Sequence, residues 1–197
     1  MPPGVLQFVP APGSRIGKVA LSHPAFAGLH FTGSNATFNT LWKQVAGNLE
    51  RYRAYPRLVG ETGGKDFVIV HESAGVEETA AALVRGAFEY QGQKCSAASR
   101  AFIPASLWPG LEPRLREQVA AIRMGDVADF TNFMGAVIDR AAFGRIAGFI
   151  DVARRSPDAE VLAGGRCDDS RGWFIEPTIV RARRPELPLM REEIFGP

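Results

Sequence analysis

Short apolar runs alternate along the chain with longer segments in which apolar residues recur every three or four positions. This spacing predicts helices over residues 37–52, 76–90, 106–124 and 139–155. The short runs, bounded by Gly, Pro or polar turns, predict strands over residues 5–9, 29–32, 57–60, 67–70, 99–103, 161–163 and 173–180. The tail from Arg181 is irregular, with one helical turn expected near Met190. Alternating strands and helices predict an α/β fold with open parallel sheets.

Two segments carry the strongest patterns. The helix over residues 139–155 has a continuous apolar face, and the run Phe67–Val70 is apolar throughout, which is typical of a strand buried in a parallel sheet. Residues 29–52 read as strand, Gly-Ser turn and helix, which is half of a βαβ unit. This pattern changes near Glu61, so we expect one domain portion over residues 1–61 and another over residues 62–197.

Composition narrows the functional classes. A chain of 197 residues, 46% hydrophobic and 22% charged, is typical of a globular protein, and no apolar run reaches the roughly 18–20 residues that span a bilayer. The net charge is only +2 and the basic residues are scattered along the chain, which argues against a nucleic-acid partner. Two cysteines form no disulfide framework and indicate a reducing compartment. Because the N-terminus shows neither a secretory signal nor a transit peptide, we expect the cytoplasm, or the mitochondrial matrix in a eukaryote.

Cys95 is the first candidate for chemistry. It lies in the polar segment Gln91-Gly92-Gln93-Lys94-Cys95-Ser96, which is poor material for a core. A thiol becomes a nucleophile when its surroundings favour the thiolate, and the adjacent Lys94 could supply a positive field. The alternative is a buried, inert cysteine, the usual fate of an isolated Cys. Cys167, in a Gly- and Asp-rich turn, is predicted to be an ordinary surface residue.

Glu61 is the second candidate. It opens the segment Glu61-Thr62-Gly63-Gly64-Lys65, where the glycines disfavour a helix. A carboxylate held in such a turn can act as a general base, although an ordinary turn carboxylate is the alternative. His23, His30 and His71 have no metal-ligand spacing, so no metal site is predicted.

These two segments and the final block Glu192-Glu193-Ile194-Phe195-Gly196-Pro197, in this order, resemble the aldehyde dehydrogenase superfamily. The resemblance implies that Cys95 attacks an aldehyde, that hydride passes to NAD, and that water activated by Glu61 hydrolyses the thioester. It also implies that residues 1–61 belong to a Rossmann-type NAD-binding domain and residues 62–197 to an α/β catalytic domain.

The resemblance assigns four residues to the cofactor. Gly33 and Ser34 match the family's shortened phosphate-binding turn, although a simple helix cap explains a lone Gly-Ser turn equally well. Glu193 and Phe195 match the family's Glu-x-Phe, in which Glu accepts from the nicotinamide ribose and Phe packs beside the nicotinamide. On residue type alone, they would be a surface charge and a core aromatic. NAD rather than NADP is the family expectation.

Further blocks resemble the branch of the family that oxidises L-glutamate γ-semialdehyde to glutamate in proline breakdown. They are residues 1–10, 31–38, 87–97 and 106–109. Lys94 and Ser96 match residues that flank the nucleophile in this branch, so we expect both to belong to the substrate site.

The family's chains extend beyond both ends of the matched region, so we expect this sequence to be the middle of a longer enzyme. Family members are homo-oligomers, and the segment that joins subunits is expected outside these residues. Two alternatives stay open. In the first alternative, the chain by itself is an inactive remnant or an interaction module. In the second, it is a thiol hydrolase that uses Cys95 and Glu61 without a cofactor.

Overall fold

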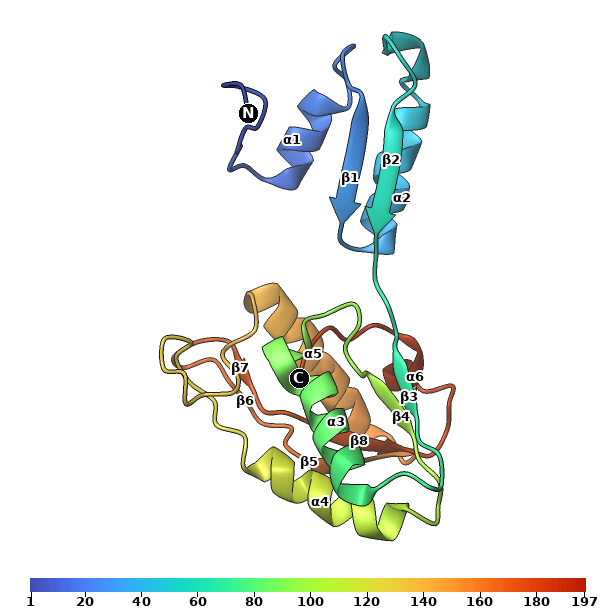
Figure 1. The fold of residues 1–197 in the computed structure, drawn as a ribbon, viewed down its shortest axis with the longest axis vertical. Helices are drawn as coiled ribbons and strands as arrows, with labels where there is room; N and C mark the ends of the chain where they lie inside the picture. Colours follow the sequence, from blue (N-terminus) through green and yellow to red (C-terminus); the bar gives the residue numbers. More distant parts are fainter. The chain divides into compact units, whose positions relative to one another are not determined.

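The structure, a computed structural model, describes all residues from Met1 to Pro197. The chain divides into two compact units, Met1–Gly63 and Gly64–Pro197 (Figure 1). None of its helices combines the length and apolar character needed to cross a lipid bilayer.

The first unit is built on a parallel pair of strands joined by a helical crossover. Strand β1 (Gly28–Thr32) pairs with β2 (Arg57–Glu61), and α2 (Asn35–Ala46) with the 3-10 turn Leu49–Arg51 connects them. The Phe38 ring of α2 stacks on Phe31 of β1 at 5.8 Å between centroids. Gly60 makes room for that ring, because a Cβ at position 60 would lie 2.4 Å from it. The predicted strand, turn and helix are confirmed here.

The N-terminal segment corrects the prediction in two ways. The predicted strand over residues 5–9 does not form, and its apolar side chains are exposed, Phe8 to 89%. A strand needs a neighbour for its backbone groups, and the prolines around this segment supply no donors. Instead, residues Gly13–Ala20 form helix α1, which buries none of its residues. The sequence analysis did not predict this helix, because it is short and contains two glycines.

The second unit contains six strands and four α-helices. Its helices are α3 (Val76–Phe88), α4 (Trp108–Ala120), α5 (Arg140–Arg155) and α6 (Pro188–Arg191). Its strands are β3 (Phe67–Ile69), β4 (Arg100–Phe102), β5 (Ala159–Ala163), β6 (Cys167–Asp168), β7 (Phe174–Ile175) and β8 (Ile179–Ala182). The α/β prediction, the three long helices and the helical turn at Met190 are confirmed.

The sheets are not all parallel, contrary to expectation. Strand β3 pairs with β4 in parallel across the α3 crossover, but β5 pairs antiparallel with β8 and β6 pairs antiparallel with β7. A parallel pair needs a crossover of a dozen or more residues, usually helical. No helix lies between β5 and β8, so the chain folds back on itself. The predicted single strand over residues 173–180 is wrong, because residues 176–178 interrupt it and its two parts, β7 and β8, pair with different strands. Cys167, predicted to lie in a turn, lies in β6, which forms a hairpin with β7.

Strand β3 is less buried than its sequence predicts. Val68 packs against the core, whereas Phe67 and Ile69 on the other face are exposed to 55% and 72%. The reason is that β3 has only β4 beside it and that the core built on α3 and α4 packs against Val68, on one face of the strand. An apolar run therefore does not by itself ensure that both faces of a strand are covered.

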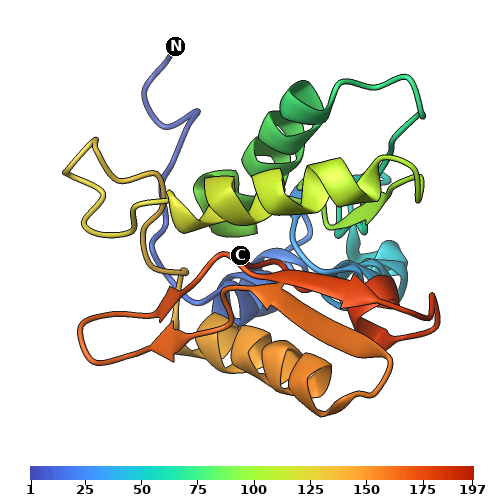
Figure 2. The same cartoon turned by 90° about the horizontal axis from the view of Figure 1, so that it is seen from below.

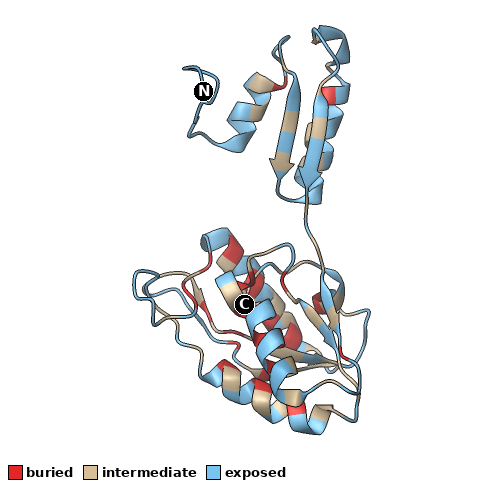
Figure 3. Ribbon diagram, viewed as in Figure 1, coloured by how far each residue is buried: buried red, intermediate tan, exposed pale blue.

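The core of the second unit has two parts. Helices α3 and α4 pack together around Leu111 and Met134, and α5 buries Ile146 and Ile150 against Ile175. Strand β5 contacts both α4 and α5, and Figure 2 shows these helices on opposite sides of the β5–β8 pair. Figure 3 shows that buried residues concentrate where these elements meet. The predicted apolar face of α5 is thus confirmed.

Candidate active site

Cys95 lies in a loop that follows an unusual left-handed turn. After α3, the residues Tyr90, Gln91 and Gly92 have φ values of 56°, 57° and 63°. Such a conformation costs a non-glycine residue roughly 1–2 kcal/mol, so tertiary contacts must hold Tyr90 and Gln91 in place. The turn ends α3 sharply and leads to Cys95, which is exposed. The alternative of a buried cysteine at position 95 is therefore wrong, and the role of Cys95 as a nucleophile stays a prediction.

Two glutamine side chains attach this loop to a distant segment. Gln91, which is buried, donates from Nε2 to the carbonyl oxygen of Ala136 at 3.1 Å. The Oε1 atom of Gln93 accepts from the backbone N–H of Ile138 at 2.9 Å. A buried amide is costly unless it is hydrogen-bonded, so these contacts fix the orientation of the loop. We therefore interpret both glutamines as residues that position the loop carrying Cys95.

Close backbone contacts hold the loop from two other sides. A Cβ at Gly64 would lie 2.4 Å from the carbonyl oxygen of Cys95, and one at Gly92 would lie 2.5 Å from that of Gly196. Both obstacles are backbone atoms, which cannot rotate away. The segment after Glu61 and the C-terminal tail, residues 192–197, therefore both lie directly against the Cys95 loop.

Gly64→Ala tests this packing. We expect the substitution to lower the free energy of unfolding of the second unit by about 1–3 kcal/mol, because the new methyl group forces the Cys95 backbone to move. Urea denaturation followed by circular dichroism measures the change. Gly144→Ala is the matched control, since a Cβ there meets nothing within 4 Å and alanine favours the helix. Equal stability of the two variants would contradict the proposed contact.

Lys94 and Ser96 flank the thiol but differ in their surroundings. The Nζ atom of Lys94 lies 2.8 Å from Oε2 of Glu89, and this ion pair holds the pKa of Glu89 below its usual value. The charge of Lys94 is thus shared with a carboxylate. Ser96 is exposed. Their proposed contact with substrate stays a prediction.

Glu193 and Phe195 belong to the C-terminal tail, and both line a cavity of the second unit. The Oε1 atom of Glu193 accepts from the backbone N–H of Gly64 at 3.0 Å, across 129 residues of sequence. Phe195 has a left-handed backbone with φ of 55° and is 36% exposed. One carboxylate oxygen of Glu193 thus holds the turn that precedes β3.

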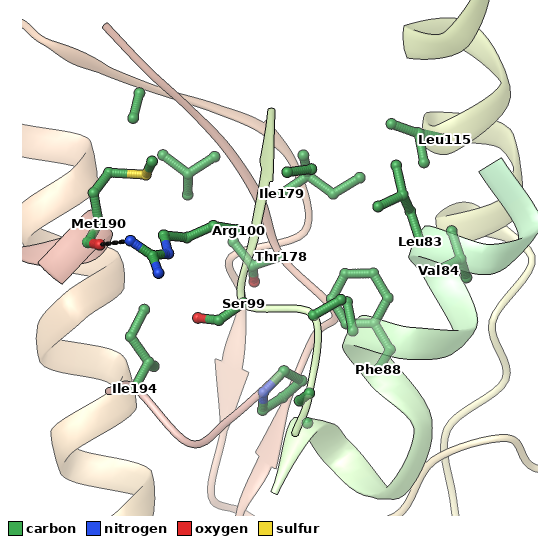
Figure 4. A pocket seen from close by; sticks show the side chains of 18 of the residues that line it. Leu83, Val84, Phe88, Ser99, Arg100, Leu115, Thr178, Ile179, Met190 and Ile194 are labelled. Carbon is green, nitrogen blue, oxygen red and sulfur yellow. Dashed lines mark hydrogen bonds between the residues drawn. The ribbon is translucent and has the colours of Figure 1, made fainter. Parts of the chain in front are cut away.

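The cavity has a volume of about 570 Å³ and lies within the second unit. Its wall is mainly apolar and comes from α3, β4, β8 and the tail (Figure 4). Arg100 points toward Met190 and donates to its carbonyl oxygen at 3.3 Å, while its buried Nε atom has no acceptor. The sequence analysis did not identify Arg100 as a cavity residue, because it lies in an ordinary strand and its acceptor is 90 residues away.

The other predicted site residues lie in the first unit. Gly33 and Ser34 join β1 to α2, and the Oγ atom of Ser34 caps the helix by accepting from the N–H of Thr37 at 3.2 Å. The backbone N–H of Gly33 donates to the carbonyl oxygen of Glu61 at 3.0 Å. The structure thus brings Glu61, at the end of β2, next to the Gly-Ser turn. The side chain of Glu61 is exposed.

Comparison with known proteins decides the family. A family model described as "Aldehyde dehydrogenase family" matches residues 1–197. The chain belongs to the aldehyde dehydrogenase family. The family and the fold expected from the three sequence blocks are therefore confirmed.

Two curated relatives of the chain carry the same protein name. The chain is 52% identical over 199 residues to "Delta-1-pyrroline-5-carboxylate dehydrogenase, mitochondrial" of Dictyostelium discoideum, covering 100% of this chain and 36% of that protein. It is likewise 52% identical over 198 residues to the protein of the same name from Homo sapiens, covering 100% and 35%. The chain thus spans about a third of the length of the curated relatives it matches.

Solved structures show the same likeness. The Delta-pyrroline-5-carboxylate dehydrogenase of Mycobacterium tuberculosis, bound with NAD, has a TM-score of 0.86 at 49% identity, covering 89% of this chain and 33% of that one. The 1-pyrroline-5-carboxylate dehydrogenase from Thermus with bound NAD has a TM-score of 0.91 at 29% identity, covering 100% and 38%.

Proposed function

We propose that the chain is part of an NAD-dependent dehydrogenase that oxidises L-glutamate γ-semialdehyde, the open form of 1-pyrroline-5-carboxylate, to L-glutamate in proline breakdown. The observation that carries the proposal is about 50% identity over the whole chain to relatives that bear this name. The exposed thiol of Cys95, in a loop held by three separate segments, supports it.

Cys95 is the nucleophile in this proposal. Its thiolate sulfur bonds to the aldehyde carbon, and the carbonyl oxygen becomes an oxyanion that the backbone N–H of Cys95 helps to stabilise. NAD, when bound, accepts the hydride that leaves this carbon, so that the sulfur carries a thioester. Glu61 takes a proton from water, the water oxygen attacks the thioester carbon, and glutamate and the free thiol separate.

Lys94 and Ser96 anchor the polar groups of the substrate in this assignment. Glutamate semialdehyde carries an α-carboxylate and an α-amine, which need charged or hydroxyl partners close to the reacting carbon. Both residues flank the nucleophile directly. The ion pair of Lys94 with Glu89 leaves donor capacity on the ammonium, since Nζ has three hydrogens.

The chain has residues that suit the cofactor. The first amides of α2 have no acceptor within the helix, so the Gly33–Ser34 turn presents donors to a phosphate group, in addition to the cap made by Ser34. Glu193 keeps one carboxylate oxygen for ribose hydroxyls, and Phe195 offers a partly exposed ring to the nicotinamide. We accordingly assign residues 1–61 to an NAD-binding domain and residues 62–197 to a catalytic domain.

The compartment and assembly follow the same proposal. Both cysteines are free and exposed, which suits a reducing compartment such as the cytoplasm or the mitochondrial matrix. The complete protein is proposed to form a homo-oligomer, as the family does.

The test uses a chimera. The 197 residues replace the matching region of the human relative, which is 52% identical to them. The formation of NADH from NAD and glutamate semialdehyde is followed by absorbance, and the same assay is carried out on the 197-residue chain alone. We expect the chimera to turn over this substrate in preference to aldehydes without an α-carboxylate. A folded chimera that binds NAD and oxidises only simple aldehydes would overturn the substrate assignment, and one that oxidises none would overturn the enzyme assignment.

A further inference from the structure

The second unit contains two lysines in opposite surroundings. The whole chain has four lysines and 19 arginines, and only Lys65 and Lys94 belong to residues 64–197. Lys94 forms its ion pair with Glu89. Lys65 is half-buried, and its Nζ atom donates to Oγ of Ser99 at 2.7 Å, with no carboxylate within ion-pair distance. One ammonium is therefore neutralised by a partner, and the other is not.

A second cation lies beside Lys65. The guanidinium of Arg100 donates to the backbone carbonyl of Lys65, and the N–H of Arg100 donates to the carbonyl of Asp66 at 3.2 Å. Arg100 also has no carboxylate partner; its other contacts are the Met190 carbonyl and the ring of Phe67, whose centroid lies 5.5 Å from Cζ. The two positive charges are thus adjacent in a partly dry environment.

This arrangement disfavours the ammonium form of Lys65. Burial, and after it the positive charge of Arg100, lower the pKa of Lys65 to about 8, against smaller opposing effects of Glu193 and Glu192. An ordinary lysine has a pKa near 10.4, so at pH 8 only about 0.4% of it is the neutral amine, compared with roughly half of Lys65. Lys65 thus has a nucleophilic amine at mildly alkaline pH.

We propose that Lys65 is a carbonyl-capturing amine, at which a small aldehyde forms a reversible imine. The lone pair of Nζ bonds to the carbonyl carbon, and the amine proton passes to the carbonyl oxygen to give a carbinolamine. Loss of water then forms the C=N bond, and hydrolysis reverses the sequence without an oxidant or reductant. Only the choice of an aldehyde as ligand rests on the proposed function.

The surroundings of Nζ provide a proton relay and access from solvent. The Ser99 hydroxyl is within hydrogen-bond distance of Nζ, so it can carry the proton between the nitrogen and the leaving oxygen. Ser99 and Arg100, the two neighbours of Lys65, line the 570 Å³ cavity, as Figure 4 shows, whereas Lys65 itself lies outside its wall. Because Lys65 is only half-buried and its contact with Ser99 is exposed, a small aliphatic carbonyl compound reaches Nζ from solvent.

The experiment traps the imine and uses Lys94 as the reference within the same molecule. The 197-residue chain is treated with propanal and cyanoborohydride at intervals from about pH 7 to about pH 9.5, and peptide mass spectrometry measures the propylated fraction of each lysine. At pH 8, we expect Lys65 to react about 10-fold faster than Lys94, after allowance for the weaker nucleophilicity of a less basic amine. The rate at Lys65 should level off above about pH 8.5, while that at Lys94 keeps rising.

Variants separate the cause from other effects. Arg100→Gln should slow the reaction of Lys65 at pH 8 several-fold, whereas Arg85→Gln, which changes an exposed arginine paired with Glu89, should leave it unchanged. Cys95→Ala should also leave it unchanged, so the result does not depend on the dehydrogenase assignment. Equal rates and parallel pH profiles at Lys65 and Lys94 in the unaltered chain would overturn the proposal, even if Arg100→Gln does not fold.

Discussion

Cys95→Ala should reduce NADH formation by the chimera at least about 10⁴-fold, the largest effect that we expect of any substitution. Removal of a catalytic nucleophile costs this much because no other group forms the covalent intermediate. The exposed position of Cys95 means that alanine leaves no buried cavity, so folding should be unaffected. The rate of NADH formation under saturating NAD and glutamate semialdehyde measures the loss.

Cys167→Ala is the matched control for this prediction. Cys167 is the other free, exposed cysteine, and it lies in the short strand β6 of the same unit. Its substitution should leave turnover within about twofold of the unaltered chimera, because surface changes away from a site have small effects. Turnover that survives Cys95→Ala but not Cys167→Ala would show that Cys167, and not Cys95, is the nucleophile.

Glu61→Gln should leave the first turnover intact and slow the later ones by about 10²- to 10⁴-fold. The amide cannot accept a proton from water, so the thioester accumulates once the hydride has left. Stopped-flow absorbance should therefore record a burst of NADH equal to the enzyme concentration, followed by a slow phase. Mass spectrometry of the quenched protein should find the glutamyl group on Cys95.

Glu50→Gln is the control for the base. Glu50 lies in the exposed 3-10 turn Leu49–Arg51 of the same unit, away from the β2 terminus that carries Glu61. This variant should keep the steady-state rate of the unaltered chimera. A Glu61→Gln variant that loses the burst as well would give Glu61 a role in the attack of Cys95, before hydrolysis.

Local patterns were sufficient where neighbours in sequence decide the structure. The helical spacing of α5 and the Gly-Ser turn before α2 were predicted, because Asp139 and Ser34 cap helices within three residues of themselves. Exposure of Cys95 was also predicted, since a segment with glutamines, a glycine and a lysine makes a poor core. The family followed from three short blocks whose order is specific.

Patterns failed where a distant partner decides the structure. Residues 5–9 have strand propensity but no strand beside them, and β5 and β8 are antiparallel because no crossover helix separates them. The two exposed side chains of β3 likewise depend on which of its faces is covered.

The order of the residues alone was thus sufficient for the family and the α/β character, and it made Cys95 and Glu61 the candidates for nucleophile and base, since these inferences depend on residue type and local order. The packed fold was needed to learn how the Cys95 loop is held, through contacts such as Gln91 with Ala136, 45 residues away, and Gly64 with the Cys95 backbone. The same is true of Lys65, which lies beside Arg100 and forms no ion pair with a carboxylate. The physical reason is that burial and charge proximity belong to the packed chain and have no local signature in the order of its residues.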